Sequence, residues 1–327
     1  MMPKFRSSLA RENLLRRVRR QRLKYITILP SLITILNGVC GFAAIVFASK
    51  GVTAGETQFS YHRLQVPYFA MAGYMILLAM VADVLDGRLA RMSKSTSSFG
   101  GQLDSLCDVI SFGVAPAFLA LNLMQHKIDE FSAINPLLES FLVRFAWLTA
   151  AIYISCAAIR LARFNVENEE DESAHMSFMG LPSPAAAGVI VSLAIFHQET
   201  LPDIAVKSHT AYVIFENAIS YSLPFLLLAT ATLMVSRVRY SHLLNQYLRG
   251  KKPFDYLIRA LLLLGVIIWS RQAALVLIFC VFAASGLVKW FYYRVVRRKS
   301  YPALAEGMPS LTPIKSGQSD ADIGNNI

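Results

Sequence analysis

Long runs of apolar residues, separated by short polar segments, constrain this chain more than any other feature. Eight runs are predicted to be membrane spans, at residues 26–49, 67–91, 101–124, 141–163, 181–197, 213–236, 254–270 and 272–293. A helix of about 20 apolar residues crosses the hydrocarbon core of a bilayer. Charged residues make up only 16% of the chain, whereas a soluble domain carries about 25%. The sequence therefore predicts an all-α polytopic membrane protein without separate soluble domains.

The runs divide the chain into four predicted parts. These are a basic N-terminal segment at 1–25, a core of six transmembrane helices at 26–236, an additional transmembrane hairpin at 237–299, and a disordered tail at 300–327. The first run is interpreted as a membrane anchor, since no clear cleavage site follows it. The fifth run is short, and the last two meet at Ser270 and Arg271, so seven spans remain an alternative.

Positive charge is concentrated in particular loops. Lys and Arg gather in the N-terminal tail, after the second, fourth and sixth runs, and after the last run. Such an excess marks the cytoplasmic side of a membrane protein, so both termini are predicted to face the cytoplasm, in a bacterial inner membrane. The formal net charge of +11 is then explained by topology and by contact with anionic membrane lipids. Nucleic-acid binding is not expected, since no basic surface is interleaved with stacking aromatics.

Four aspartates lie at the end of the second run and the start of the third: Asp83, Asp86, Asp104 and Asp108. On a helix at 100° per residue, Asp83, Asp86, Gly87, Ala90 and Arg91 fall within an arc of about 140°. Asp104 and Asp108 are four residues apart and share a face of the next helix. This face can point toward Asp83 and Asp86 across a short antiparallel connection. Ionisable residues inside membranes are costly and mark functional sites. The alternative is that they are interfacial aspartates paired with Arg88 and Arg91.

Four converging carboxylates repel one another unless a cation lies among them. None of the four cysteines is in a CxxC motif, and all lie in apolar runs, so neither zinc nor a disulfide framework is indicated. Oxygen ligands alone favour Mg²⁺ or Mn²⁺, and such an ion at a membrane surface typically holds a phosphate-bearing substrate. Gly87 and Gly100 would let a nucleotide approach the backbone closely, and Arg91 would supply a donor for phosphate.

The pattern Asp83-x2-Asp86-Gly87-x2-Ala90-Arg91-x8-Gly100-x3-Asp104-x3-Asp108 resembles the full signature of the CDP-alcohol phosphotransferases. These are membrane enzymes that transfer a phosphatidyl group from a CDP-linked lipid to an alcohol and release CMP. The resemblance implies that Asp83, Asp86 and Asp104 bind metal, with Asp108 at the same site as general base. It also implies that Asp83, Gly87, Ala90, Arg91 and Gly100 contact CDP-diacylglycerol, and that the attack is direct and in line.

Three further stretches are similar to the serine-using branch of that family. The first run contains Thr34 and Asn37, assigned to the CDP-diacylglycerol site, although Ser31 stands where the family usually has Asn. Ser-Phe-Gly-Val-Ala-Pro-Ala follows Asp108, and the fourth loop carries Arg160, Arg163 and Asn165 before Gly-Leu-Pro-Ser-Pro. Those three residues are expected to bind serine or phosphate. L-serine is the expected acceptor, phosphatidylserine the product, and a homodimer the expected assembly.

Several alternatives remain open. A sister enzyme of the same family would use choline, glycerol 3-phosphate or inositol phosphate as the acceptor. A transporter would bind a translocated cation at the aspartates. An Asp-rich prenyltransferase of the membrane would place its acidic motifs on well-separated helices. No histidine is followed by Lys two residues later, which excludes the His-x-Lys phosphatidyltransferases. Thr34 and Asn37 can instead join helices, Arg160 and Arg163 can serve topology alone, and residues 180–187 suit close packing.

Overall fold

The structure is a computed structural model that describes residues 31–52, 58–61, 64–93, 98–128, 136–170, 178–236, 238–240 and 270–295. Seven described helical segments are long and apolar enough to cross a membrane: Ser31–Val52, Tyr68–Leu89, Phe99–Gln125, Pro136–Val166, Ser183–Lys207, His209–Val235 and Arg271–Tyr292. The prediction of an all-α polytopic membrane protein is confirmed. The predicted basic segment, the span at 254–270 and the tail lie outside the described residues.

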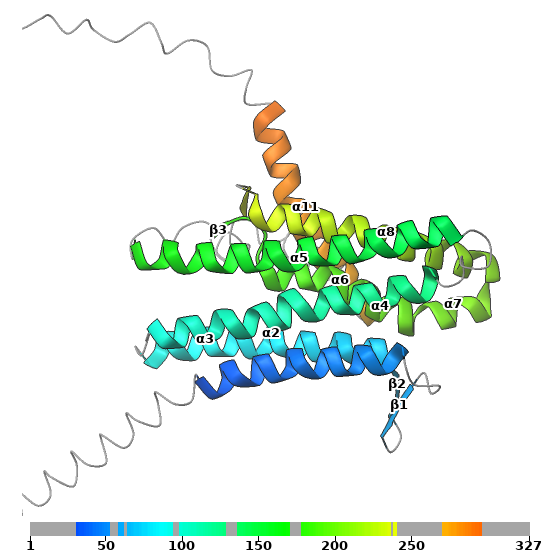
Figure 1. The fold of residues 1–327 in the computed structure, drawn as a ribbon, viewed down its shortest axis with the longest axis horizontal. Helices are drawn as coiled ribbons and strands as arrows, with labels where there is room; N and C mark the ends of the chain where they lie inside the picture. The colour runs from blue at the N-terminus through cyan, green and yellow to red at the C-terminus, as the bar shows by residue number, and fades with distance from the viewer. Residues whose placement is uncertain are drawn as a thin grey trace, which may run out of the picture. The chain divides into compact units, whose positions relative to one another are not determined.

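Helices make up nearly all of the described chain (Figure 1). After the first helix, Ser31–Val52, come α2 (Tyr68–Ser93), α3 (Ser98–Asp108), η1 (Val109–Val114), α4 (Ala115–Ile128), α5 (Pro136–Glu170), α6 (Ser183–Glu199), α7 (Leu201–Lys207), α8 (His209–Val235) and α11 (Arg271–Val295). The strands are short: β1 (Gln58–Tyr61) pairs antiparallel with β2 (Leu64–Pro67), and β3 (Phe178–Met179) with β4 (Arg239–Tyr240). The chain divides into units at 1–288 and 289–327, and the contacts below belong to the first.

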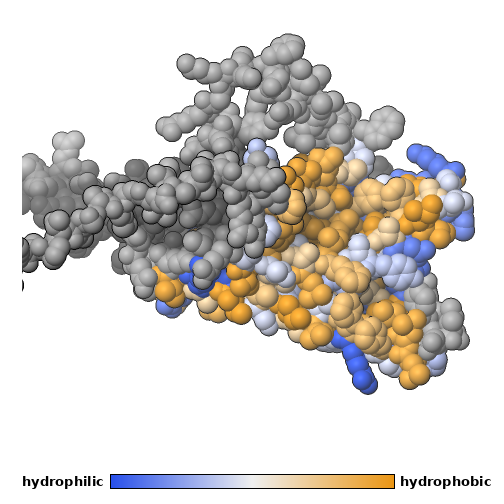
Figure 2. All heavy atoms as spheres, turned by 90° about the horizontal axis from the view of Figure 1, so that it is seen from above, coloured by the Kyte–Doolittle hydropathy of each residue, from blue (hydrophilic) through white to orange (hydrophobic). Residues whose placement is uncertain are grey.

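The span Phe99–Gln125, formed by α3, η1 and α4 and called the central span below, is the most enclosed of the described spans. In its most apolar stretch 72% of the residues are buried, against 18–39% in the other six described spans. The other helices expose large apolar side chains such as Phe42, Phe141 and Phe225, and apolar residues cover much of the coloured surface on the face shown in Figure 2. An apolar exterior suits helices that face lipid, because lipid tails offer no polar partners.

Glycines let the first helix and the central span approach closely. A Cβ on Gly41 would lie 2.7 Å from Ser111 Cα, and one on Gly38 would lie 2.9 Å from Cys107 Sγ. Small residues at such crossings are typical of membrane helix pairs, where tight packing replaces the hydrophobic effect. The first helix is therefore held against the central span at the level where α3 ends and η1 begins.

The central span contains one π-helical turn, η1, directly after Asp108. Pro116 has no backbone N–H, so it cannot donate to the carbonyl of Phe112 four residues earlier. The buried hydroxyl of Tyr153 on α5 donates to that carbonyl instead, at 3.1 Å. Pro116 and the Tyr153 hydroxyl therefore lie at the end of the π turn, and π turns of this kind occur often at functional sites.

Residues 178–183, which we call the strap, lead into α6 and are tied to the end of α8. Beyond the β3–β4 pairing, Gly180 N–H donates to the Val238 carbonyl at 2.9 Å and Leu181 N–H to the Leu233 carbonyl at 3.0 Å. Gly180 has a φ of +83°, and a Cβ there would lie 2.2 Å from the Met234 carbonyl oxygen. Only glycine suits this position.

Helix α11 packs against α6. A Cβ on Gly188 would lie 2.2 Å from the ring of Phe279, so the glycine provides the space that the ring occupies. Nearby, the Glu199 carboxylate accepts hydrogen bonds from Gln272 Nε2 at 2.6 Å and from the Tyr74 hydroxyl at 2.8 Å. The predicted extra C-terminal helix at 272–293 is therefore part of the bundle through its first turns.

Candidate active site

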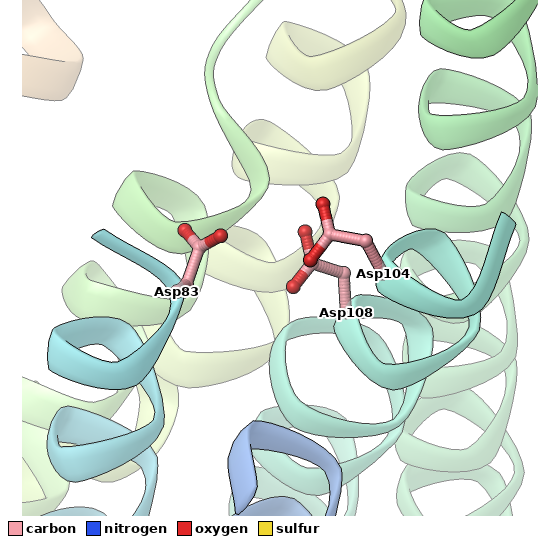
Figure 3. Close-up of side chains that lie close together, drawn as sticks. All are labelled: Asp83, Asp104 and Asp108. Atoms are coloured by element: carbon pink, nitrogen blue, oxygen red, sulfur yellow. The ribbon is translucent and has the colours of Figure 1, made fainter. Parts of the chain in front are cut away.

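Three of the four predicted aspartates converge. One carboxylate oxygen from each of Asp83, Asp104 and Asp108 lies within 4.8 Å of the other two. Asp83 comes from α2, whereas Asp104 and Asp108 lie one turn apart on α3, and the side chains point into a common space (Figure 3). The spacing of four residues on α3 places two carboxylates on one face. Helix α2, which packs against η1 and α4 of the same span, adds the third.

Asp86 lies beside this group rather than within it. Its carboxylate is 6% exposed and accepts a hydrogen bond from the Thr34 hydroxyl of the first helix. It also interacts electrostatically with Asp83 and Asp104. The structure therefore shows a three-carboxylate group with a fourth carboxylate next to it, held by a threonine 52 positions away in the chain.

Asn37 holds Asp108. Its side-chain nitrogen donates to Asp108 Oδ1 at 2.8 Å, and its own backbone carbonyl accepts a hydrogen bond from Ser111 Oγ at 2.9 Å. Asn37 is fully buried, and its side-chain oxygen has no hydrogen-bond partner among the described residues. The first helix therefore contributes two polar side chains, one to each of two aspartates, from positions three residues apart.

Arg160, a basic residue of α5, lies near the carboxylates of Asp83 and Asp108. Its guanidinium interacts electrostatically with Asp83 and Asp108, yet no ion pair joins it to either within the part of the chain that the structure describes. Arg160 Nη1 donates to Ser183 Oγ at 2.9 Å, while Nε is buried and has no partner among the described groups. A positive charge therefore lies near the acidic group without neutralising it by direct contact.

The other predicted residues of α5 lie near the beginning of α3. Asn165 Oδ1 is 3.0 Å from Ser105 Oγ, which also lies 3.1 Å from the Gly101 carbonyl oxygen. Arg163 is exposed. Of the three residues assigned to serine or phosphate, the structure thus brings Arg160 to the carboxylates and Asn165 to the helix that carries two of them.

The predicted nucleotide-binding positions border open space where the structure describes them. A Cβ on Gly87 would meet nothing within 4 Å. Gly100 lies partly exposed in the first turn of α3. Ala90 and Arg91 continue α2, but their side chains lie outside the described ones, and their roles stay predictions.

The donor set fits a divalent cation. Three carboxylates within a few ångströms, in surroundings that exclude much of the water, repel one another strongly. Arg160 supplies one positive charge nearby and does not contact them directly. Carboxylate oxygens without Cys or His at the same place are the ligands of hard cations. This arrangement can therefore hold Mg²⁺ or Mn²⁺ beside an open side suited to a phosphate group.

Sequence reasoning missed the supporting residues of this site. Ser105 lies inside the acidic motif and Ser183 inside Gly-Leu-Pro-Ser, but neither pattern indicates a partner. Tyr153 carries no sequence signal except that Pro116 must leave a carbonyl without its helical donor. That orphan carbonyl could have been predicted, whereas the helix that satisfies it could not.

Comparison with known proteins agrees with the motif. A model of the CDP-alcohol phosphatidyltransferase family matches residues 27–239. A CDP-diacylglycerol–serine O-phosphatidyltransferase of Helicobacter pylori is 28% identical over 267 residues, which cover 81% of this chain and 92% of the relative. Enzymes with the same name from Saccharomyces cerevisiae and Methanocaldococcus jannaschii are 34% identical over 167 residues (50% of this chain, 51% of the relative) and 38% identical over 117 (36% and 47%).

Proposed function

Because the chain belongs to the CDP-alcohol phosphatidyltransferase family, we propose that it transfers the phosphatidyl group from CDP-diacylglycerol to L-serine. The products are phosphatidylserine and CMP. The observation that carries this proposal is the convergence of Asp83, Asp104 and Asp108 at one end of two adjacent helices. The names of several relatives, which specify serine as acceptor, support the choice of alcohol.

Asp83, Asp104 and Asp108 hold Mg²⁺ or Mn²⁺ in this proposal, with Asp86 completing the set. A divalent cation bound there supplies positive charge that stabilises the CMP leaving group. Thr34 keeps Asp86 in place through its hydroxyl, so the first helix helps to build the acidic site. Gly87, Ala90, Arg91 and Gly100 line the CDP pocket, and the open space at Gly87 supports a close approach of the nucleotide.

Asp108 acts as the general base. Asn37 donates to its Oδ1, which fixes the carboxylate and leaves Oδ2 to accept the proton of the serine hydroxyl. A hydroxyl attacks phosphorus only when a base removes its proton in the transition state. The attack is a direct in-line displacement, without a covalent enzyme intermediate.

Arg160 binds the anionic end of the acceptor, with Arg163 and Asn165 contributing to serine or phosphate binding. A carboxylate near three aspartates would be repelled, so its binding requires a nearby cation. Arg160 has donors that the protein leaves unused, including a buried Nε, and an arginine fork matches the geometry of a carboxylate.

The seven apolar helices among the described residues support an integral membrane protein. We place it in a bacterial inner membrane, with the aspartates on the cytoplasmic side, because Lys and Arg gather in the loops at that end. We also propose a homodimer, which chemical crosslinking in native membranes followed by mass analysis would test: a band only at the monomer mass would contradict it.

The deciding experiment supplies purified protein in proteoliposomes with CDP-diacylglycerol, Mn²⁺ or Mg²⁺, and labelled serine. Labelled phosphatidylserine and an equal amount of CMP are expected, and neither should form when a chelator is present. Product from choline or glycerol 3-phosphate but none from serine would overturn the acceptor. Cation flux without CMP release would overturn the enzyme class itself.

A further inference from the structure

The strap connects the site to the end of α8. Its backbone is tied to α8 through Gly180 and Leu181, whose N–H groups donate to the carbonyls of Val238 and Leu233. Leu181 is fully buried, which adds packing to these hydrogen bonds. The path of the strap is therefore set by the end of α8, and this path determines the position of Ser183, the first residue of α6.

Ser183 is the point where the strap meets the site. Its side chain is fully buried, and its Oγ accepts the hydrogen bond from Arg160 Nη1 at 2.9 Å. The other end of the same guanidinium, Nε, has no partner among the described residues. Among the described residues, Arg160 is thus held by a hydrogen bond from Nη1, while its buried Nε is left without a protein partner.

The placement of Arg160 matters because its long side chain has many rotamers. Ordering such a side chain during binding weakens the affinity for the ligand, and a protein that orders it beforehand avoids that loss. The electrostatic interaction with Asp83 and Asp108 would otherwise draw the guanidinium onto the carboxylates. The bond to Ser183 competes with that attraction and keeps the positive charge beside the acidic group.

We propose that Ser183 is a positioning residue, through which the strap holds Arg160 for the carboxylate of the acceptor amino acid. This inference rests on the proposed function, because it assumes an acceptor with a carboxylate. It assigns the affinity for that substrate to a hydrogen bond between α5 and the first turn of α6, and not to the metal-binding aspartates.

The test compares steady-state kinetics of variants in proteoliposomes. Ser183→Ala is expected to raise the KM for serine by about tenfold, the effect of one lost hydrogen bond to a charged group, with kcat and the KM for CDP-diacylglycerol changed less than about twofold. Ser183→Thr should retain the wild-type KM, whereas Ser183→Val, of equal size but without a hydroxyl, should behave like Ser183→Ala. Ser192→Ala is the matched control, because Ser192 is buried in the same helix and bonds only to the Val189 carbonyl.

Coupling between the two residues gives the second measurement. If Ser183 acts through Arg160, the double variant Arg160→Ala/Ser183→Ala will have the same KM for serine as Arg160→Ala alone. CDP binding, measured by calorimetry without serine, should be the same in all these variants. The inference would be overturned if the rise in the KM for serine in the double variant equalled the product of the two single rises. An unchanged KM for serine in Ser183→Val, or a rise only in the KM for CDP-diacylglycerol, would also overturn it.

These outcomes separate the inference from the function on which it rests. A wild-type protein that makes no phosphatidylserine from serine contradicts the proposed function. A wild-type protein that does so, with Ser183→Val and Ser183→Thr alike in their KM for serine, contradicts the role of Ser183 alone.

Discussion

Each aspartate of the acidic motif has a different environment, although the four look equivalent in the sequence. Asp108 accepts a hydrogen bond from Asn37, Asp86 accepts one from Thr34, and Asp83 and Asp104 converge with Asp108. These differences support the different roles that we propose for them. The carboxylate that a buried amide orients is best suited to proton transfer, because its free oxygen is held at one place.

Replacing the proposed base tests this assignment. Asp108→Asn is expected to lower kcat by at least about 100-fold, the usual contribution of a general base, while CDP binding is retained in part. Phosphatidylserine formation and calorimetric binding of CDP are the two measurements. Asp203→Asn, at an exposed aspartate of α7, should have no effect. Turnover at the wild-type rate in Asp108→Asn would contradict the base role.

The bond between Thr34 and Asp86 is expected to contribute to stability. Thr34→Val keeps the shape of the side chain but leaves a buried carboxylate without its hydroxyl donor, at a cost of about 1.5–3 kcal/mol in the free energy of unfolding. Thermal unfolding in detergent measures this. Thr232→Val removes an exposed hydroxyl that bonds to its own helix and should change little. Equal melting temperatures for the two variants would contradict a contribution of the Thr34–Asp86 hydrogen bond to stability.

Cation binding predicts a second stability effect. A ligand that binds only the folded protein raises its melting temperature, so Mg²⁺ or Mn²⁺ should stabilise the wild-type protein and a chelator should remove the gain. In Asp104→Asn the rise in melting temperature caused by the cation should be much smaller, because a neutral amide replaces one of the three converging carboxylates. The same melting curves, recorded with and without cation, provide the measurement. An identical response in both proteins would contradict the assignment of the cation to this group.

At the level of helices, the central span is shaped by contacts that differ along its length. Its first part packs against the glycines of the first helix, and its π turn accepts a hydrogen bond from α5. Both contacts lie close to Asp108 in the chain. They fix the position of the span that carries two carboxylates relative to the first helix and α5.

The link between Tyr153 and Pro116 can be measured by a double-mutant cycle. Tyr153→Phe should lower the free energy of unfolding by about 1–3 kcal/mol, because the buried Phe112 carbonyl loses its donor. Pro116→Ala supplies a backbone N–H for the same carbonyl, so Tyr153→Phe should cost clearly less in that background. Chemical denaturation of all four proteins is the measurement. Strictly additive effects would show that the tyrosine does not replace the missing donor.

Close approach of the first helix to the central span makes Gly41 sensitive. Gly41→Ala would place a methyl group 2.7 Å from the Ser111 Cα, and forcing such helices apart typically costs about 1–3 kcal/mol. Gly101→Ala is the control, because its Cβ would meet nothing within 4 Å, and alanine in a helix is more stable than glycine by about 0.5–1 kcal/mol. Thermal unfolding should therefore move in opposite directions for the two substitutions. A shift in the same direction would contradict this account of the helix crossing.

For the molecule as a whole, the orientation in the membrane can be tested from the two ends of the bundle. Phe99 begins the central span at the aspartate end, and Val206 lies in α7, which precedes the helix α8; both are exposed. An impermeant maleimide added to intact cells should label Val206→Cys but should label Phe99→Cys only after permeabilisation. The reverse pattern would contradict the cytoplasmic placement of the site. The four native cysteines, all free, require a background without them or an unsubstituted control.

Local periodicity determined most of what could be predicted from the sequence. Apolar runs predicted six of the seven described spans to within about five residues, whereas the fifth span extends to Lys207 and not only to residue 197. The spacings within 83–91 and 104–108 predicted which side chains share a helix face. These properties depend only on the rise and turn of a helix. The acidic motif also predicted the family, which the comparisons confirm.

Only the tertiary structure decided how the faces of different helices meet. It placed Thr34 against Asp86 and Asn37 against Asp108, left three carboxylates converging, and joined Arg160 to a serine 23 residues further along. Such pairings depend on how far one helix slides and rotates against another. That choice is made by packing details, such as a glycine opposite Ser111 or a strap tied to α8, which have no periodic signature in the chain.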